Sequence, residues 1–182
     1  MKKKLLLFFI IIVILFGFFN FVLINDDMKP EDFKNTEPVL QIEKYFEGNV
    51  KAWGLLQDRG GRIMRQFKAD MSGKFENNIL TLEEDFFWKD GENQKRVWKI
   101  EKIDEHNYIG TASDVVGTAK GMSYGSAFKF EYNLMVPFKG KNIKISFDDW
   151  IFKQDNENAI NRATITKFGF KVGELTVFFQ KT

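Results

Sequence analysis

Cysteine is absent from the 182-residue chain. Disulfide bonds, thiolate metal sites, cysteine nucleophiles and lipid attachment through an N-terminal cysteine are therefore excluded. Histidine occurs once, at His106, so a zinc site would need carboxylates for its other ligands and a hydrolase triad has one histidine to draw on. His106 lies in a polar turn, where we expect a solvated side chain. We predict no metal site, no cofactor, no catalytic residue and no enzyme activity.

A strong charge of either sign is also lacking. The formal net charge is +2, and Lys2, Lys3 and Lys4 supply three of the positive charges. Residues 1–24 contain no acid, so the rest of the chain is close to neutral. Because a nucleic-acid-binding protein carries a basic face on its folded part, we exclude nucleic acid as a partner. Protein partners stay unidentified.

The most conspicuous feature present is a long apolar run, LLLFFIIIVILFGFFNFVLI, at residues 5–24. About 20 residues at ~1.5 Å each reach ~30 Å, the thickness of the hydrocarbon core of a bilayer. Secretory signals have a shorter apolar region that ends in a small-residue cleavage site, and no such site follows here. We therefore predict a retained transmembrane anchor, with a long cleaved signal peptide as the alternative.

Charge around this run predicts its orientation and the division of the chain. Lysines precede the run and Asp26 and Asp27 follow it, so the positive-inside rule places the N-terminus in the cytoplasm and the body outside, in a periplasm. We expect a signal anchor at residues 1–24 and a polar tether at 25–38, which contains two prolines. The remaining residues, 39–182, form the body.

The body shows a period of two after one short helical pattern at residues 39–48. We count roughly nine strands with short turns between them, among them the hairpin signal Asp90-Gly91. So many twisted strands in one sheet either split into two layers or close. The pattern predicts an all-β, antiparallel, up-and-down, lipocalin-like β-barrel with a short N-terminal helix. A β-sandwich is the alternative.

One segment, residues 110–127, is rich in glycine and alanine. It lacks the Gly-Lys-Ser/Thr ending of a phosphate loop. We interpret its glycines as strand positions at bends or beneath bulky neighbours. A wide loop at the mouth of the barrel is the alternative.

The alternation of side chains places a few charged groups inside the barrel. In FDDWIFK, residues 147–153, Asp149 is in phase with the inward-facing Phe147, and Asp148 points outward, unless a bulge exchanges the two. By the same rule, Glu84 shares a face with Phe86 and Trp88, and Arg96 shares one with Trp98.

Buried charges are costly unless they pair, so we expect Arg96 to pair with Asp149 or Glu84; the face of Arg162 is ambiguous. Three interpretations follow: a structural ion-pair network, a polar anchor in a ligand cavity where Arg96 binds a carboxylate or phosphate, and acid–base chemistry by paired carboxylates. The candidate ligand-binding residues are Arg96, Asp149, Glu84, Trp98, Trp88, Phe128, Phe130, Tyr132 and Phe147.

Several stretches of the body together resemble one family. They are KYFEGNVKAWGLLQDRGGRIMRQF, TLEEDFFWKDGENQKRVWKI, YIGTASDVVGTAKGMSYGSAF and FDDWIFKQD with NRATITKFGFKVGELTVFFQK. Over about residues 39–182 the chain resembles bacterial proteins grouped as domain of unknown function 3833. The resemblance implies an extracytoplasmic protein, commonly described as a lipoprotein, with no established activity and a leaning towards lipid-like ligands. The missing lipidated cysteine departs from that pattern, and the apolar run could replace it as an anchor.

These observations together predict a single-pass protein of the bacterial inner membrane, held through residues 5–24, with its body in the periplasm. We expect the barrel to bind a small amphipathic ligand, such as a lipid or a fatty-acid-like molecule. The alternatives are a non-enzymatic envelope scaffold with a filled core and a carboxylate-dependent enzyme.

Overall fold

The computed structural model describes residues 10–13, 28–138 and 140–182. The predicted anchor at 5–24 lies outside the described residues except for residues 10–13, which are helical. In the part of the chain that the structure describes, no helix combines the length and apolarity needed to cross a membrane.

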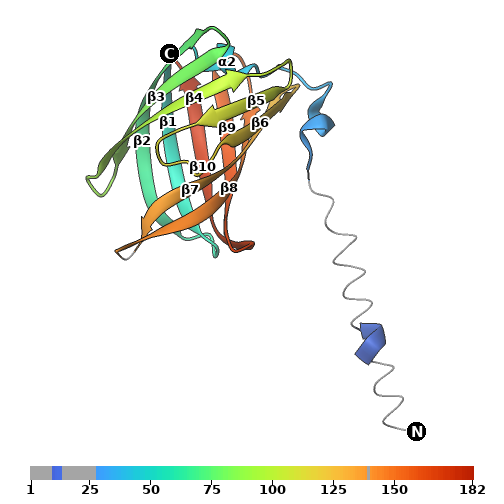
Figure 1. The fold of residues 1–182 in the computed structure, drawn as a ribbon, viewed down its shortest axis with the longest axis vertical. Helices are drawn as coiled ribbons and strands as arrows, with labels where there is room; N and C mark the ends of the chain where they lie inside the picture. Colours follow the sequence, from blue (N-terminus) through green and yellow to red (C-terminus); the bar gives the residue numbers. More distant parts are fainter. Residues whose placement is uncertain (1–9, 14–27, 139) are drawn as a thin grey trace.

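The described body is a closed antiparallel barrel of ten strands, in the order β1-β10-β9-β8-β7-β6-β5-β4-β3-β2 (Figure 1). Each strand pairs with its neighbours in sequence, and β1 pairs with β10 to close the sheet. The predicted up-and-down barrel is confirmed, and the β-sandwich alternative is wrong. The strands are β1 (Gly48–Asp58), β2 (Ile63–Glu76), β3 (Ile79–Trp88), β4 (Asn93–Lys102), β5 (Asn107–Thr111), β6 (Ala119–Tyr124), β7 (Ala127–Phe138), β8 (Lys141–Lys153), β9 (Asn158–Lys167) and β10 (Phe170–Lys181).

The predicted count of nine strands is wrong by one, because β6 lies within the glycine-rich segment. Glycine and alanine hide the alternation there, but they face inward for a packing reason. A Cβ atom at Gly110 would overlap the ring of Phe130, and one at Gly121 would press on the ring of Phe128. The interpretation of these glycines as strand positions beneath bulky neighbours is therefore confirmed. Residues 112–118 form the loop between β5 and β6, where Val115 makes an isolated bridge to Leu134.

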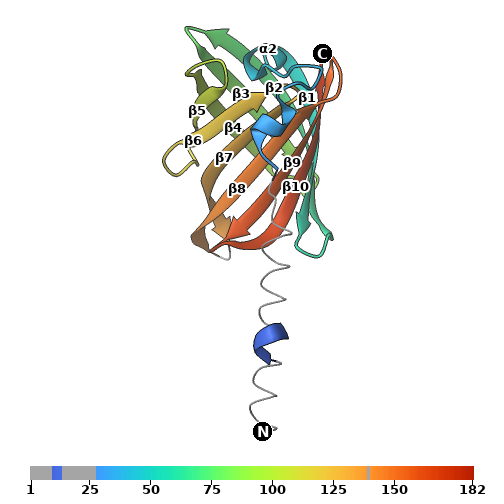
Figure 2. The same cartoon turned by 90° about the vertical axis from the view of Figure 1, so that its right-hand side faces the viewer.

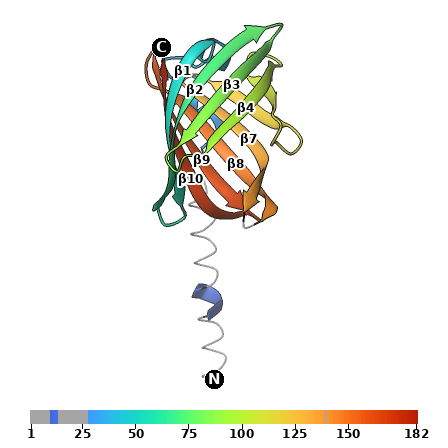
Figure 3. The same cartoon turned by 90° about the vertical axis from the view of Figure 1, so that its left-hand side faces the viewer.

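The two ends of the barrel differ. The short helix α2 (Ile42–Tyr45), which confirms the predicted N-terminal helix, covers one end, where Leu40 and Ile42 are each 1% exposed. We call this the closed end; the β2–β3, β4–β5, β6–β7 and β8–β9 turns also lie there. The opposite end, called the open end, carries the β1–β2, β3–β4, β7–β8 and β9–β10 turns, as the views from the two sides show (Figures 2 and 3).

Part of the predicted tether packs against the outer wall of the barrel. The 3-10 helix η1 (Pro30–Phe33) places the ring of Phe33 6.0 Å from Trp150 and 5.6 Å from Phe152 (Figure 2). This contact explains why both faces of β8 are apolar beyond Asp149. Trp150 points outward but is covered, and the pairing of β7 with β8 runs through this region without a bulge.

Candidate functional site

A charged cluster lies at mid-height inside the barrel, and strand register brings it together. Glu84 on β3 stands directly opposite Arg96 on β4. On the far wall, Asp149 on β8 stands opposite Phe130 on β7. Because side chains alternate along each strand, all three predicted charged residues share the inner face with buried aromatic rings. We call Glu84, Arg96, Asp114 and Asp149 the central cluster.

Arg96 is the only base of the cluster, and Asp114 holds it. Its Nη2 and Nε atoms donate to Oδ2 of Asp114 at 2.7 and 3.1 Å. Its Nη1 lies 3.8 Å from Oε2 of Glu84, so the predicted ion pair with Glu84 is present but long. Burial lowers the pKa of Arg96, but Glu84, Tyr132 and Asp114 outweigh that effect and the net pKa is raised. Sequence reasoning missed Asp114 because it lies in the β5–β6 loop, where alternation gives no face.

Asp149 does not pair with Arg96, and two other side chains donate hydrogen bonds to it. Its Oδ2 accepts a hydrogen bond from the hydroxyl of Tyr132 at 3.0 Å, and its Oδ1 accepts one from Nδ2 of Asn161. Burial raises the pKa of Asp149 to about 6, against the lowering effect of Asn161 and Tyr132. Asn161 was missed, although it lies in phase with the inward-facing Ala159 and Ala163. Both oxygens of Asp149 are thus engaged.

Glu84 and Asp114 each keep one acceptor without a hydrogen bond, although that of Glu84 lies within ion-pair distance of Arg96. Among the described residues, Oε2 of Glu84 and Oδ1 of Asp114 are buried and accept no hydrogen bond. Burial raises the pKa of Glu84 to about 7, although Arg96 opposes this. The cluster contains three carboxyl groups and one guanidinium. Additional hydrogen-bond donors or a positive charge would therefore stabilise it. The expected binding of a carboxylate or phosphate by Arg96 would require Asp114 to be displaced.

Arg162 does not join the cluster. It points outward, its side chain is 67% exposed, and it pairs with Glu174 at 3.5 Å.

The predicted aromatic residues divide between the two halves of the barrel. Trp98, Phe128 and Phe130 pack tightly, with ring centroids of Trp98 and Phe130 5.1 Å apart, and are at most 6% exposed. They fill the half of the barrel between the cluster and the closed end. Tyr132 stacks on Phe147 at 5.0 Å, beside Asp149.

The inner face between the cluster and the open end is apolar and only partly buried. We call it the mouth lining; its residues are Phe86, Trp88, Val136, Ile145, Phe147 and Leu175. At its rim, Arg65 lies over the ring of Trp88 at 3.9 Å and bridges Asp90 and Glu92. The Nε1 donor of Trp88 is buried and has no hydrogen-bond partner in the described part of the chain. A polar cluster with free acceptors therefore adjoins apolar side chains that water reaches.

Two surface pockets lie near the closed end. One of about 120 Å³ is lined by Tyr45 and its neighbours, and one of about 250 Å³ lies beside Val50 and Met71. Neither pocket is lined by a residue of the central cluster. The candidate site therefore rests on the positions and bonding of the cluster side chains and not on a pocket.

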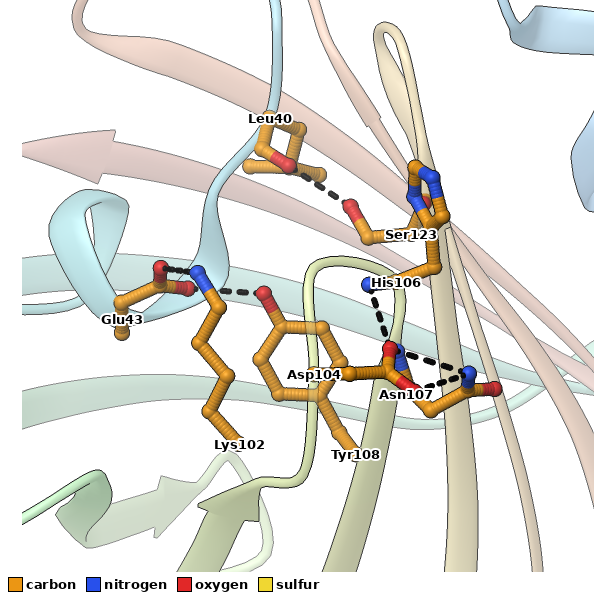
Figure 4. A network of polar contacts seen from close by, with 8 residues as sticks. All are labelled: Leu40, Glu43, Lys102, Asp104, His106, Asn107, Tyr108 and Ser123. Carbon is orange, nitrogen blue, oxygen red and sulfur yellow. Dashed lines mark hydrogen bonds and ion pairs between the residues drawn. The ribbon is translucent and has the colours of Figure 1, made fainter.

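A second polar network ties α2 to the closed end (Figure 4). Oε1 of Glu43 lies 2.5 Å from Nζ of Lys102, and its Oε2 accepts a hydrogen bond from the hydroxyl of Tyr108 at 2.9 Å. Burial raises the pKa of Glu43, but Lys102, the backbone and Tyr108 more than offset it, so the net pKa is lowered. This glutamate is fully satisfied.

The expected solvated position of His106 is wrong. Its ring is partly buried, stacks on Tyr124 at 4.0 Å, and brings Nδ1 within 2.9 Å of the carbonyl oxygen of Ser123. The polar sequence around His106 reflects an Asp104 turn, in which Asp104 accepts from the backbone of His106 and Asn107.

The family described as "Protein of unknown function (DUF3833)" matches residues 20–181. No curated protein matches the chain.

Two solved structures share the fold. A protein of unknown function from the DUF3598 family of Nostoc punctiforme aligns with a TM-score of 0.60 at 12% identity, covering 80% of this chain and 51% of its own. The chain thus spans about half the length of that protein. The S-type phycobiliprotein lyase CPES from Guillardia theta aligns with a TM-score of 0.54 at 8% identity, covering 84% of this chain and 96% of its own. At these identities the likeness concerns the fold alone.

Proposed function

The chain belongs to the DUF3833 family, whose function is unknown, and from this premise we propose that it binds a small amphipathic ligand in the open half of the barrel. The observation that carries the proposal is the adjacency of two surfaces of different character. The mouth lining offers partly exposed apolar side chains to an alkyl or ring group. The central cluster beneath it keeps free acceptors on Glu84 and Asp114 for a polar group. Binding sites of this kind combine apolar walls with a few polar anchors.

The charge of the cluster favours one kind of polar group. Arg96 already directs two nitrogens at Asp114, while the carboxyl groups outnumber it. A buried anion would meet repulsion from these carboxylates, whereas an ammonium or hydroxyl group would supply the missing donors. The ligand we propose therefore carries a hydrogen-bond donor at its polar end, and a cationic amine fits best.

We further propose that the barrel works at a membrane. The apolar run at 5–24 and the lysines before it support a single-pass anchor in a bacterial inner membrane, with the barrel in the periplasm. An amphipathic ligand would be concentrated at such a surface.

The test uses three soluble probes that differ only at the head group: hexylamine, hexanol and hexanoate. Each is titrated into the full chain in mild detergent, and tryptophan fluorescence reports occupancy near Trp88. We expect hexylamine to bind most tightly, hexanol next and hexanoate least. Tightest binding of hexanoate, or saturable binding of none, would overturn the proposal.

A matched pair of variants locates the site. Glu84→Gln removes the charge and one acceptor from the cluster, and we expect it to weaken hexylamine about tenfold, the effect of ~1.4 kcal/mol. Glu83→Gln changes the adjacent, outward-facing residue and should leave the affinity unchanged. Equal affinities for both variants would place the binding elsewhere.

The second candidate function is acid–base chemistry at Glu84. The observation that favours it is the burial of Glu84, which is 9% exposed; burial raises its pKa to about 7, which suits a group that exchanges protons at neutral pH. Binding is preferred because both neighbouring carboxylates are held by other side chains: Asp149 accepts hydrogen bonds from Tyr132 and Asn161, and Asp114 accepts two from Arg96. Chemical change of a bound ligand, seen by mass spectrometry and lost in Glu84→Gln, would favour the enzyme.

A further inference from the structure

Large apolar side chains are exposed at the turns of the open end. Phe168 and Phe170, at the tip of the β9–β10 turn, are 89% and 77% exposed. Ile63 and Met64 are more than half exposed beside the β1–β2 turn, and Phe138 is 52% exposed beside the β7–β8 turn. Leaving such side chains in water is unfavourable, so a group of them at one end indicates a surface that becomes covered.

The same end is basic. Around the exposed apolar tips, the described residues carry six bases and two acids: Arg59, Arg62, Lys141, Lys144, Lys167 and Lys171 with Asp58 and Glu174. The fourth turn there, β3–β4, adds a balanced set of Arg65, Lys89, Asp90 and Glu92. Lys167 lies 5.3 Å over the ring of Phe168, so charge and apolar surface are interleaved. This composition complements a surface that is negative outside and apolar within, because such a surface attracts basic side chains and takes up apolar ones.

The course of the chain places such a surface at the same end. Before η1, residues 28–29 lead towards the open end (Figure 2). About nine residues separate Phe33 from the end of the proposed anchor. The three steps within η1 rise ~2 Å each and the other six span at most ~3.3 Å each, so the reach is ~26 Å. Along β8, from Trp150 and Phe152 beside Phe33 to Lys141 at the open end, about nine to eleven residues rise ~30–36 Å, or ~23–28 Å along the barrel axis at a tilt of ~40°. The tether therefore just reaches the level of the open end.

We propose that the open end of the barrel rests on the surface of an anionic lipid bilayer, with Phe168, Phe170 and Ile63 in the headgroup region. The anchor holds the barrel near the bilayer, and the basic, aromatic turns orient it. A ligand dissolved in the bilayer then meets the mouth lining without crossing water; this last step rests on the proposed function, whereas the lipid contact does not.

The absence of cysteine makes a direct test clean, because single-cysteine variants can be labelled without background. The full chain carrying Phe170→Cys or Ile63→Cys is labelled with bimane and reconstituted in vesicles of phosphatidylcholine and phosphatidylglycerol that contain nitroxide-labelled lipid. The matched control is Ile103→Cys, an apolar residue 50% exposed at the closed end. We expect severalfold stronger quenching at 170 and 63 than at 103. Equal quenching at the two ends, or stronger quenching at 103, would overturn the proposal.

A second pair of variants tests the charge. Combining Lys141→Glu with Lys171→Glu should reduce quenching at position 170 in vesicles with phosphatidylglycerol and change it little in phosphatidylcholine alone, whereas Lys74→Glu at the closed end should have no effect. Quenching that is unchanged by these substitutions would contradict the proposal. Crosslinking of two chains through position 170, without contact to lipid, would assign the surface to a second copy of the chain and also contradict it.

The two proposals fail separately. Phe170→Ser should lower the lipid contact and leave hexylamine binding in detergent unchanged. Lipid contact without probe binding would sink the proposed function alone, and probe binding without lipid contact would sink this inference alone.

Discussion

Two buried glutamates, one at the closed end and one at mid-height in the barrel, differ in how their carboxyl oxygens are bonded. Glu43 at the closed end is 3% exposed and Glu84 at mid-height is 9% exposed. The first is satisfied by Lys102 and Tyr108, and its pKa is lowered. The second keeps an acceptor without a donor, and burial raises its pKa to about 7. At the closed end the buried carboxylate is fully hydrogen-bonded and stabilises the fold. At mid-height a buried carboxyl oxygen lacks a hydrogen-bond donor, as expected of a binding site.

The sharpest way to test this difference is to remove one aromatic ring from each half. Phe128→Ala empties a site that is 1% exposed and should cost about 3–5 kcal/mol of unfolding free energy. Phe147→Ala, in the partly exposed mouth lining, should cost roughly half as much because water and neighbours can fill the gap. Urea unfolding of the full chain in mild detergent measures both. Equal losses would mean that the two halves are packed alike.

The next largest effect concerns the closed-end glutamate. Glu43→Gln leaves Lys102 without its ion pair and should destabilise the fold by about 2–4 kcal/mol. Glu47→Gln, an exposed neighbour, should change stability by less than about 0.5 kcal/mol. Thermal unfolding of both variants is the measurement. A neutral result for Glu43→Gln would show that the network is dispensable.

At Glu84 the same substitution should act with the opposite sign at neutral pH. The folded-state pKa is raised, so the folded chain binds the proton more tightly and stability is lost as pH rises from about 4.5 to about 7. Glu84→Gln removes this loss and should stabilise the fold by about 1–3 kcal/mol above pH 7, with no difference below the unfolded value of 4.5. Unfolding is measured across this range, with Glu83→Gln as the control. A constant difference at all pH values would contradict the assignment.

The smallest effects on stability are expected at the exposed tips. Phe170→Ser at the open end and Ile103→Ser at the closed end each replace an exposed side chain and should shift the unfolding free energy by less than about 0.5 kcal/mol. Urea unfolding checks both. A loss above about 1 kcal/mol for Phe170→Ser would show that its ring packs in the folded barrel and is not held for an external surface.

Alternation explains what could be foreseen about the fold and the site. The inward positions of Glu84, Arg96 and Asp149 follow from the phase of their own strands, and the structure places them there. Asn161 carried the same signal and could have been found. The strand β6 was missed because glycine and alanine do not show which face is apolar.

Which side chains contact each other was harder to predict than which face of the sheet each one lies on. Asp114 lies in a loop without a phase, and its hold on Arg96 depends on where that loop crosses the barrel. The same limit applies to His106, whose packing on Tyr124 comes from a neighbouring strand.

The sequence by itself determined that the body is an antiparallel β structure with a few charges on its inner face, because a period of two is a local property of each strand. Only the tertiary structure decided which charges meet, which glutamate is satisfied, and which end of the barrel is covered. Those outcomes depend on the register between strands and on the path of one loop and one short helix, and no single stretch of sequence contains that information.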